Sequence, residues 1–372
     1  MLPRVLVPFA AALLTAGLAA QDLLGVTWNG ATVLIDSHTA GVTPLGMGLF
    51  GQNALGRTGD GQYWSTQRVS TTYYQYTRID PTTGSASYAS YGSDIRDFAT
   101  APGNRLYGIR NGTVNPYEDW LVLVDPATGV TTSIGSTGYT DIQGLVVHLG
   151  VLYAWDVFAG LLVVDPATGA AVDPFPNVSG PAYQQSLCSH PDGRLLLGGG
   201  DSNGPDQLFS LDVGTGVATL IGTMPAIYDI RGIEPLGGFA VPFGQPCQGT
   251  YGPTYLGVTG ALHGGGQLQS VSINHAANTV GAVILGLDTT TYGGAPLPRL
   301  LDPLVGTNNC SLFVAIDASL FVVTGPTGPA TLQYGFSLPA WTTGVTFHLQ
   351  HACFEPVAGN SSWSNGVTVN VQ

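Results

Sequence analysis

The sequence predicts an all-β protein made of a five-bladed β-propeller and a C-terminal β-sandwich. Three observations predict this fold class. Apolar residues alternate with polar ones in short runs that turn residues interrupt, and no stretch shows helical periodicity. One hairpin motif recurs five times at a period of about 44 residues. After Pro246 the motif stops while the short alternating runs continue, which indicates a second all-β domain.

Composition narrows the classes of protein to which the chain can belong. Its 372 residues carry a formal net charge of −13, with 44% hydrophobic and 9% charged residues, which suits a folded chain with a core. All ten basic residues are Arg. Such a chain is a poor partner for nucleic acid, whose phosphates need Lys and Arg to neutralise them. It also lacks the Lys that a Schiff base or a nucleotide-binding loop requires.

The N-terminus has the pattern of an export signal. Arg4 supplies an early positive charge, the apolar run Val5–Leu14 follows, and small residues lead up to Ala20. The apolar run is too short for a transmembrane anchor, which needs about 20 residues. We expect a signal peptide over Met1–Ala20 and a secreted or extracytoplasmic protein, at the cell surface or in the periplasm. A buried N-terminal helix is the alternative.

A hairpin of the form Leu-Val-Asp-Pro-Ala-Thr-Gly defines the repeat. Proline presets the turn, the Asp side chain accepts hydrogen bonds from the backbone amides just ahead, and Gly takes the positive φ before the next strand. One such motif would be an ordinary hairpin, but five at a near-constant period predict a repeat architecture. The motif aspartates, spaced 44, 45, 40 and 47 residues apart, are Asp36, Asp80, Asp125, Asp165 and Asp212.

Each period holds four short strands, A to D, and the hairpin joins strand C to strand D. Four strands in 40–47 residues make one propeller blade. The first blade begins at strand B, with Leu23–Trp28, and Ile230–Ile233 is a strand A with nothing after it. Pairing the two would complete a blade and remove the exposed sheet edges. We therefore expect five blades over residues 21–243; a stacked solenoid is the alternative, which would need capping repeats.

Two of these blocks resemble a known group of proteins. Leu106–Gly108, and the run Leu162–Gly169 that reads Leu-Val-Val-Asp-Pro-Ala-Thr-Gly, are similar to secreted bacterial β-propeller repeat proteins. The resemblance extends over the predicted propeller and implies the same fold. Because many propellers of different function share the hairpin, the resemblance brings no catalytic residue to this chain.

The segment 247–372 is expected to form a β-sandwich, with Val241–Pro246 as the linker. Seven apolar-alternating runs separated by turns suggest two packed sheets. The strand pattern resembles C-terminal modules of secreted bacterial proteins. The runs are 255–262, 268–273, 283–287, 312–323, 330–336, 345–353 and 367–371.

Four cysteines allow three disulfide pairings in an oxidising compartment. We expect Cys247–Cys310 because both residues fall in the predicted C-terminal domain. The sequence leaves the state of Cys188 and Cys353 open.

The innermost strands predict a polar belt around the propeller channel. Strand A is innermost in a blade, so equivalent positions meet at the channel, and Asp and Arg two residues apart share a face. The belt has four interpretations: a structural tie between blades, a site for a saccharide or another ligand, a Ca²⁺ site, or paired carboxylates for glycoside hydrolysis. The aligned positions are Asn53, Arg96, Gln143, Gln185 and Arg231, preceded in three blades by Asp94, Asp141 and Asp229.

Two further groups have both a functional and a structural interpretation. An aromatic group in or beside the second blade suits a saccharide or protein surface, or else covers the blade faces. In Phe347–Cys353, His351 and Cys353 share a strand face, and a metal site there would need His263 or His275 from other strands. Packing is the competing interpretation. The aromatic group is Tyr63, Trp64, Tyr73, Tyr74, Tyr76, Tyr88 and Tyr91.

These observations favour a secreted, non-enzymatic binding or cell-surface protein whose propeller presents a ligand face. A polysaccharide or a surface protein is the expected partner, without nucleic acid or a transmembrane segment. No cofactor is expected, and the sequence leaves open whether the protein binds Ca²⁺. The first alternative is an extracellular glycoside hydrolase or lyase that uses Asp94, Asp141 and Asp229; the second is a scaffold without a small-molecule site.

Overall fold

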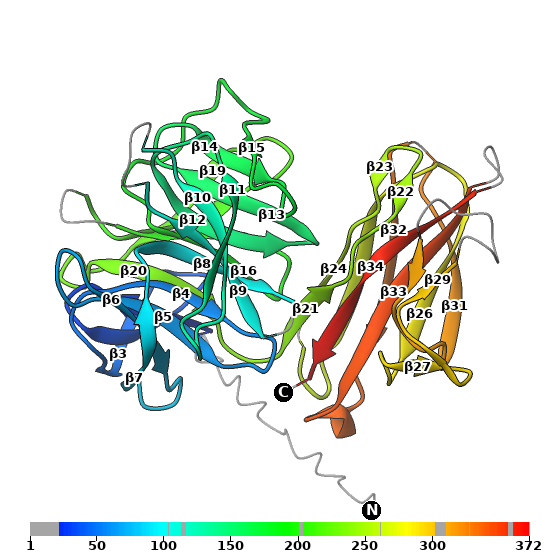
Figure 1. Ribbon diagram of the computed structural model, residues 1–372, viewed down its shortest axis with the longest axis horizontal. Helices are drawn as coiled ribbons and strands as arrows, with labels where there is room; N and C mark the ends of the chain where they lie inside the picture. The colour runs from blue at the N-terminus through cyan, green and yellow to red at the C-terminus, as the bar shows by residue number, and fades with distance from the viewer. Residues whose placement is uncertain are drawn as a thin grey trace, which may run out of the picture.

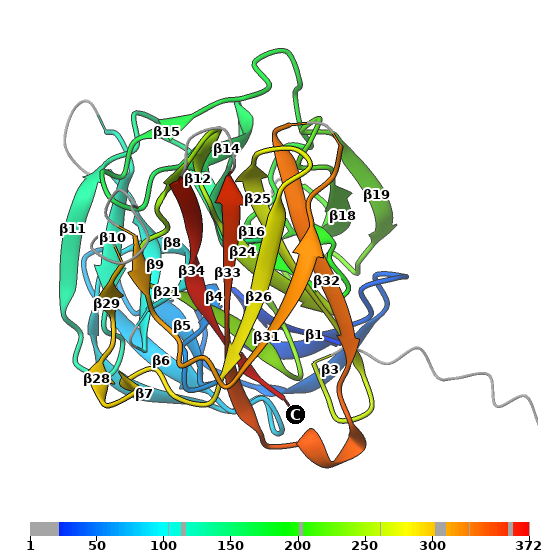
Figure 2. The same ribbon diagram turned by 90° about the vertical axis from the view of Figure 1, so that its right-hand side faces the viewer.

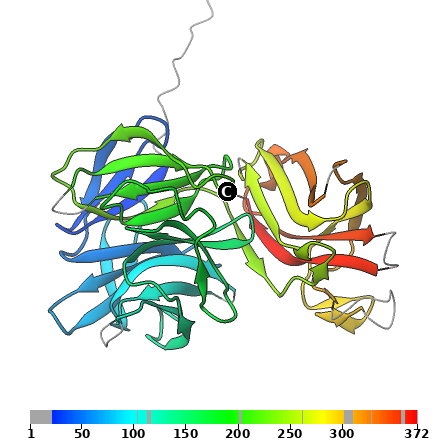
Figure 3. The same ribbon diagram turned by 90° about the horizontal axis from the view of Figure 1, so that it is seen from above.

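The computed structural model consists of a five-bladed propeller and a two-sheet C-terminal region that lie side by side (Figures 1 and 3). The predicted fold class is confirmed. The predicted signal peptide lies outside the described residues. The structure describes residues 22–102, 104–112, 117–200, 204–260, 262–301, 310–326, 328–355 and 360–371.

Each blade is a sheet of four antiparallel strands that follow one another in space from strand A to strand D. Blade 1 contains β20 (Ile230–Pro235), β1 (Leu23–Thr27), β2 (Ala31–Ile35) and β3 (Val42–Met47). Blade 2 contains β4 (Gln52–Arg57), β5 (Tyr63–Arg68), β6 (Tyr74–Ile79) and β7 (Ala86–Gly92). Blade 3 contains β8 (Ile95–Ala101), β9 (Arg105–Arg110), β10 (Trp120–Val124) and β11 (Thr131–Ser136). Blade 4 contains β12 (Ile142–His148), β13 (Val151–Asp156), β14 (Gly160–Val164) and β15 (Ala171–Val172). Blade 5 contains β16 (Ser186–Ser189), β17 (Leu195–Gly199), β18 (Gln207–Leu211) and β19 (Ala218–Thr223).

The ring closes as the sequence predicts. β20 pairs with β1, so the last propeller strand completes the first blade, with Gly25 opposite Ile233. The five A strands lie next to one another around the axis in the order β4, β8, β12, β16 and β20, and β20 returns to β4. Closure leaves the inner edge of no blade open to another chain.

A small residue in strand D forms the seam between successive blades. In four blades strand D carries a β-bulge directly before this residue, which is Gly46, Ser90, Gly135 or Gly222. The hairpin turn of the following blade packs against it. A Cβ atom on Gly135 would lie 1.9 Å from the carbonyl oxygen of Thr168, and one on Gly46 would lie 2.0 Å from that of Thr83. Backbone therefore touches backbone at these seams.

The seam of blade 2 shows how a side chain can be accommodated. Ser90 takes the place of the glycine, and its hydroxyl donates a 2.7 Å hydrogen bond to the carbonyl of Pro126 in the next hairpin. The repeated turn is thus both a strand connection and the contact surface for the preceding blade. This double role accounts for the Asp, and the Thr three residues after it, that all five turns share.

Buried aspartates connect two of the five blade junctions. The carboxylate of Asp119 accepts a 2.9 Å hydrogen bond from the amide of Ile142, the first residue of the next strand A. Asp206 accepts an equivalent 2.9 Å bond from Ile230. Both side chains are 1% exposed. Burial raises the pKa of Asp119 to about 7 and that of Asp206 to about 6, although the amide bonds oppose the shift.

We expect Asp119→Asn to remove part of the pH dependence of stability. A carboxyl group whose pKa is higher in the folded than in the unfolded chain stabilises the fold fully below pH 3.8, and this contribution is lost as the pH rises through about 7. From pH 5 to pH 8, the stability of Asp119→Asn should rise relative to wild type by about 2–3 kcal/mol, measured by urea unfolding. Asp206→Asn should show a smaller change, and parallel pH profiles for wild type and both variants would contradict the assignment.

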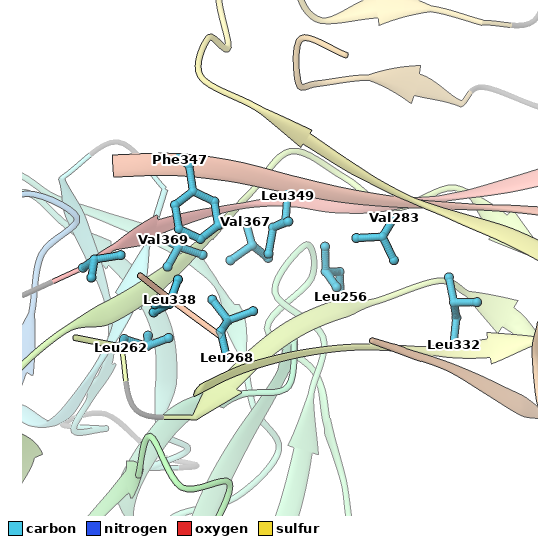
Figure 4. Packing of buried hydrophobic residues seen from close by; sticks show 11 residues of the cluster. Leu256, Leu262, Leu268, Val283, Leu332, Leu338, Phe347, Leu349, Val367 and Val369 are labelled. Carbon is cyan, nitrogen blue, oxygen red and sulfur yellow. The ribbon is translucent and has the colours of Figure 1, made fainter. Parts of the chain in front are cut away.

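The C-terminal region is a β-sandwich. A five-stranded sheet has the order β21 (Phe239–Phe243), β34 (Asn360–Asn370), β33 (Thr346–Glu355), β26 (Val280–Gly286) and β31 (Ala318–Val323). A three-stranded sheet has the order β24 (Leu256–Gly260), β25 (Gln267–His275) and β32 (Ala330–Ser337). Figure 2 views the larger sheet, and Figure 4 shows the core between the two sheets, where Leu268 and Leu332 face Val283 and Leu349.

Short elements complete this region. The pairs are β22 (Gln248–Gly249) with β23 (Gly252–Pro253), β27 (Thr291–Tyr292) with β28 (Ala295–Pro296), and β29 (Arg299–Leu300) with β30 (Ser311–Leu312). A 3₁₀ helix, η1, spans Ala340–Thr342.

The C-terminal domain begins earlier than the sequence predicts. The sequence predicts a propeller that extends to residue 243 and a linker over Val241–Pro246, but β21 pairs with β34 along its whole length. Pro242 and the nearby glycines are typical of a linker. Pro242 is tolerated because β21 is an edge strand, where one side of the backbone needs no ladder partner.

The predicted disulfide Cys247–Cys310 is present and closes a loop with a sequence separation of 63. It packs with Leu301 and Trp363 on the outer face of the larger sheet. Cys188 lies in the propeller core and Cys353 in β33, both buried. The disulfide is compatible with an extracytoplasmic protein.

Candidate functional site

A pocket of about 600 Å³ opens at one mouth of the propeller channel. Its walls come from the ends of strands and the adjoining loops of blades 1, 2 and 3, so residues far apart in the sequence meet there. The aromatic residues stand among three guanidinium groups, two carboxylates and several neutral polar groups. The lining residues are Trp28, Asn53, Thr66, Arg68, Thr71, Tyr74, Asp94, Arg96, Asn111, Asp229 and Arg231.

The pocket contains part of the predicted belt. Asn53, Asp94, Arg96, Asp229 and Arg231 line it. Among the remaining predicted positions, Gln185 lies beside the pocket, because its side-chain oxygen accepts a 3.3 Å bond from Arg231.

Asp141 and Gln143 are not among the residues that line this pocket. The carboxylate of Asp141 instead accepts a 2.8 Å hydrogen bond from the neighbouring Thr140 hydroxyl. The structure therefore brings two of the three predicted channel aspartates to one pocket.

Arg231 is held in place by a carboxylate and an aromatic ring. Its Nε and Nη2 donate to the two oxygens of Asp229, at 2.6 and 3.2 Å. This bidentate pair is the geometry that guanidinium and carboxylate groups favour. The guanidinium carbon also lies 5.5 Å from the ring centre of Trp28. Trp28 is half-buried, so one part of its ring remains available at the pocket wall.

The other carboxylate of the pocket is bound by neutral donors. Asp94 accepts a 3.0 Å hydrogen bond from the side-chain amide of Asn111. Burial raises the pKa of Tyr74, the nearby charge of Asp94 raises it further, and Arg68 and Arg96 oppose the shift. The hydroxyl of Tyr74 therefore lies among Asp94 and two guanidinium groups.

Sequence reasoning missed the residue that closes the channel below this pocket. Asp97 is fully buried, and its Oδ2 accepts hydrogen bonds from the amides of Leu145 and Leu187, at 3.0 and 3.1 Å. The hydroxyl of Ser186 donates to the same oxygen at 3.0 Å. Burial raises the pKa of this carboxyl well above its ordinary value. One side chain thus connects the A strands of blades 3, 4 and 5 across the axis.

Asp97 could have been found by aligning the five A strands, because it is the one large side chain at its position. The equivalent residues are Ala54, Gly144, Ser186 and Gly232. Four small side chains leave room at the axis for a single larger one. A carboxylate suits this place because the inner edges of the A strands present backbone amides that need acceptors.

A second, smaller cavity of about 100 Å³ lies on the other side of Asp97, where the propeller meets the sandwich. Arg57 lines it, donates a 2.6 Å hydrogen bond to the carbonyl of Gly237 and lies 4.0 Å from the ring centre of Phe239. Burial raises the pKa of Glu234 to about 8, against the charge of Arg57. Arg96 lines the mouth pocket and Phe98 lines this cavity, so Asp97 separates the two.

The predicted metal alternative finds no supporting cluster. Within the described part of the chain, no three His, Cys, Asp or Glu side chains are grouped as metal ligands would be. His275 and His351 do approach each other in the sandwich core, but the hydroxyl of Ser272 lies between them, at 2.6 and 2.7 Å. Burial lowers the pKa of His351 to about 3. These histidines are part of a buried hydrogen-bond network with Ser272.

The aromatic group of blade 2 divides into three parts. Tyr63, Trp64 and Tyr76 are buried in the blade. Tyr88 and Tyr91 are exposed on β7, where their rings pack edge to face. Tyr73 packs against Tyr91 in the same way, and Tyr74 lines the mouth pocket.

No family model matches the chain, and no curated protein matches it. Distant structural similarity to β-propeller proteins is found. A protein of unknown function from Bacteroides thetaiotaomicron has a TM-score of 0.37 and 13% identity, covering 54% of this chain and 58% of that one. A gluconolactonase from Xanthomonas campestris has a TM-score of 0.35 and 12% sequence identity, and the match covers 57% of this chain and 79% of that one. TolB from Acinetobacter baumannii has a TM-score of 0.35 and 12% sequence identity, and the match covers 67% of this chain and 60% of that one.

These similarities concern the fold alone, and the match spans just over half the length of the Bacteroides protein. Within the described residues, none of the helices combines the length and the apolar character needed to cross a bilayer.

Proposed function

We propose that this protein is a secreted, non-enzymatic binding protein of the bacterial β-propeller repeat type, and that its mouth pocket holds part of a saccharide. The observation that carries the proposal is a pocket of about 600 Å³ that combines aromatic and polar groups above a closed floor. Ligand sites commonly measure about 300–1,000 Å³ and place a few polar groups around an apolar surface.

The side chains of the pocket match the chemistry of a sugar ring. Trp28 and Tyr74 offer aromatic surface with a polar tip, against which the C–H face of a sugar packs. Asn53, Thr66 and Asn111 offer neutral donors and acceptors for hydroxyl groups. The sandwich would then act as a spacer or an attachment module.

Hydrolysis is the alternative, and the carboxylates of the pocket argue against it. A retaining or inverting glycosidase needs one carboxyl that donates a proton and a second that acts as nucleophile or base. Asp229 is bound through both oxygens to Arg231, and Asp94 accepts from Asn111. Neither has the isolated, apolar surroundings that favour a protonated carboxyl group.

Binding and hydrolysis can be separated with one panel of polysaccharides and oligosaccharides. Calorimetry on the mature protein should detect saturable binding to at least one glycan, and no reducing ends should be released. Trp28→Ala should weaken that binding about tenfold or more, because the aromatic wall is lost. Trp341→Ala is the matched control, since Trp341 is 77% exposed on η1 in the sandwich.

Two results would contradict the proposal. If Trp28→Ala and Trp341→Ala bind every glycan equally well, the mouth pocket is not the site. If reducing ends are released and the release is lost in Asp94→Asn or Asp229→Asn, the pocket is an active site.

A further inference from the structure

The inference rests on the proposed function and names the class of saccharide. We infer that the mouth pocket takes a saccharide bearing an anionic group, a carboxylate or a sulfate, and that Arg68 and Arg96 bind that group.

The charges of the pocket carry the inference. Three of the ten arginines of the chain line one pocket, although the chain as a whole has a net charge of −13. Among the described residues, two carboxylates line the same pocket. The charge of the side chains that line this pocket is therefore net positive, in contrast to the net negative charge of the chain as a whole.

The three arginines of the pocket differ in their contacts with carboxylates. Arg231 is neutralised by Asp229 through two hydrogen bonds and contacts the Trp28 ring. Within the described residues, Arg68 and Arg96 form no hydrogen bond or ion pair with a carboxylate. Both nevertheless lie close enough to Tyr74 to influence its hydroxyl.

The position of the two groups suits a ligand rather than the fold. Arg68 is at the exposed end of β5, and Arg96 is half-buried in β8, one residue before the channel plug Asp97. An arginine presents five N–H donors in a planar fork that binds two oxygens of one acid group. Asp94 lines the same pocket, and Asn111 already donates a hydrogen bond to it. Arg96 also lies near enough to the buried Asp119 to oppose the rise in its pKa, but no salt bridge joins the two among the described residues. A carboxylate or sulfate on the ligand would supply the acceptors that these two forks lack.

The same charges disfavour a cation in this pocket. Ca²⁺ needs six to eight oxygen ligands, several of them carboxylates. Here the two carboxylates are accompanied by three guanidinium groups, which would repel a divalent ion.

The test compares oligosaccharides that differ only in charge. The probes are a galacturonate oligomer, its fully methyl-esterified form, and a neutral oligosaccharide of the same length with and without sulfate groups. Affinities are measured by calorimetry with wild type, Arg68→Gln, Arg96→Gln and Arg78→Gln. Arg78 is a matched control because it is exposed on β6 and does not line the mouth pocket.

We expect the galacturonate oligomer to bind about tenfold or more tightly than its ester, and Arg68→Gln and Arg96→Gln each to remove most of that difference. Arg78→Gln should bind as wild type does. Binding should also weaken with added salt, which screens exposed charges. Preference for the sulfated over the neutral oligosaccharide would identify sulfate as an accepted group, and preference for galacturonate alone would identify carboxylate.

The outcomes distinguish this inference from the proposed function. Equal binding of charged and neutral forms would overturn the inference and leave saccharide binding in place. A charge preference that Arg68→Gln and Arg96→Gln both retain would also overturn it. If none of the probes binds, and the wider panel shows no binding either, the proposed function fails.

Discussion

Replacing Gly135 by alanine is expected to destabilise the propeller by about 3 kcal/mol or more. The new Cβ would lie 1.9 Å from the carbonyl oxygen of Thr168, a distance that real Cβ contacts do not reach. Neither partner can yield easily, since one is a bulged strand and the other a tight turn of the next blade. The seam must therefore open by more than about 1 Å, and packing on both sides of it is lost.

A matched glycine makes the test specific to the seam. Gly325 has no atom within 4 Å of a built Cβ and no positive φ, so Gly325→Ala should be neutral or slightly stabilising through the unfolded chain. Gly46→Ala should behave like Gly135→Ala, because its Cβ would lie 2.0 Å from Thr83. Urea unfolding of the three variants gives the comparison. Equal stabilities for Gly135→Ala and Gly325→Ala would contradict this account of the blade contact.

Replacing Asp97 by alanine is the second large effect we expect, about 3–5 kcal/mol of stability. The substitution removes the common acceptor of two buried amides, on Leu145 and Leu187, and of the Ser186 hydroxyl. A buried donor left without an acceptor costs about 1–3 kcal/mol. The loss also leaves an empty space where the A strands of three blades meet.

Asn is the matched substitution at this position. Asp97→Asn keeps one side-chain oxygen to accept from the two amides and the Ser186 hydroxyl, so its stability should stay within about 1 kcal/mol of wild type at neutral pH. Thermal unfolding followed by circular dichroism distinguishes the two variants. An alanine variant as stable as the asparagine variant would show that Asp97 does not hold the blades together.

Much of the fold could be predicted because the repeat is local. The Asp-Pro-Ala-Thr-Gly turn is specified by its own residues, and its period of about 44 residues reveals the blades. Ring closure was also predictable, since Leu23–Thr27 lacks an inner strand and Ile230–Pro235 supplies one. The start of the sandwich could not be predicted. The proline in β21 suggested a linker, but β21 is an edge strand, and an edge strand tolerates proline.

The candidate site was predictable only where it lies on strand A. Equivalent positions of an innermost strand must face the channel, which identified Arg96 and Arg231. Trp28 and Tyr74 are at strand ends, and Arg68 ends β5, the second strand of its blade. Their approach to the pocket therefore depends on how whole blades pack. Asp141 follows the same sequence pattern as Asp94 but does not line the pocket, which draws its walls from blades 1 to 3.

We propose that a saccharide occupies the mouth pocket and packs against Trp28. The most direct measurement is the tryptophan emission of wild type and Trp28→Phe during titration with a glycan that binds. We expect a saturable change in wild type that is absent in Trp28→Phe, because the other five tryptophans do not line the pocket. The same change in both proteins, at the same glycan concentrations, would show that the ligand binds elsewhere and would contradict the claim.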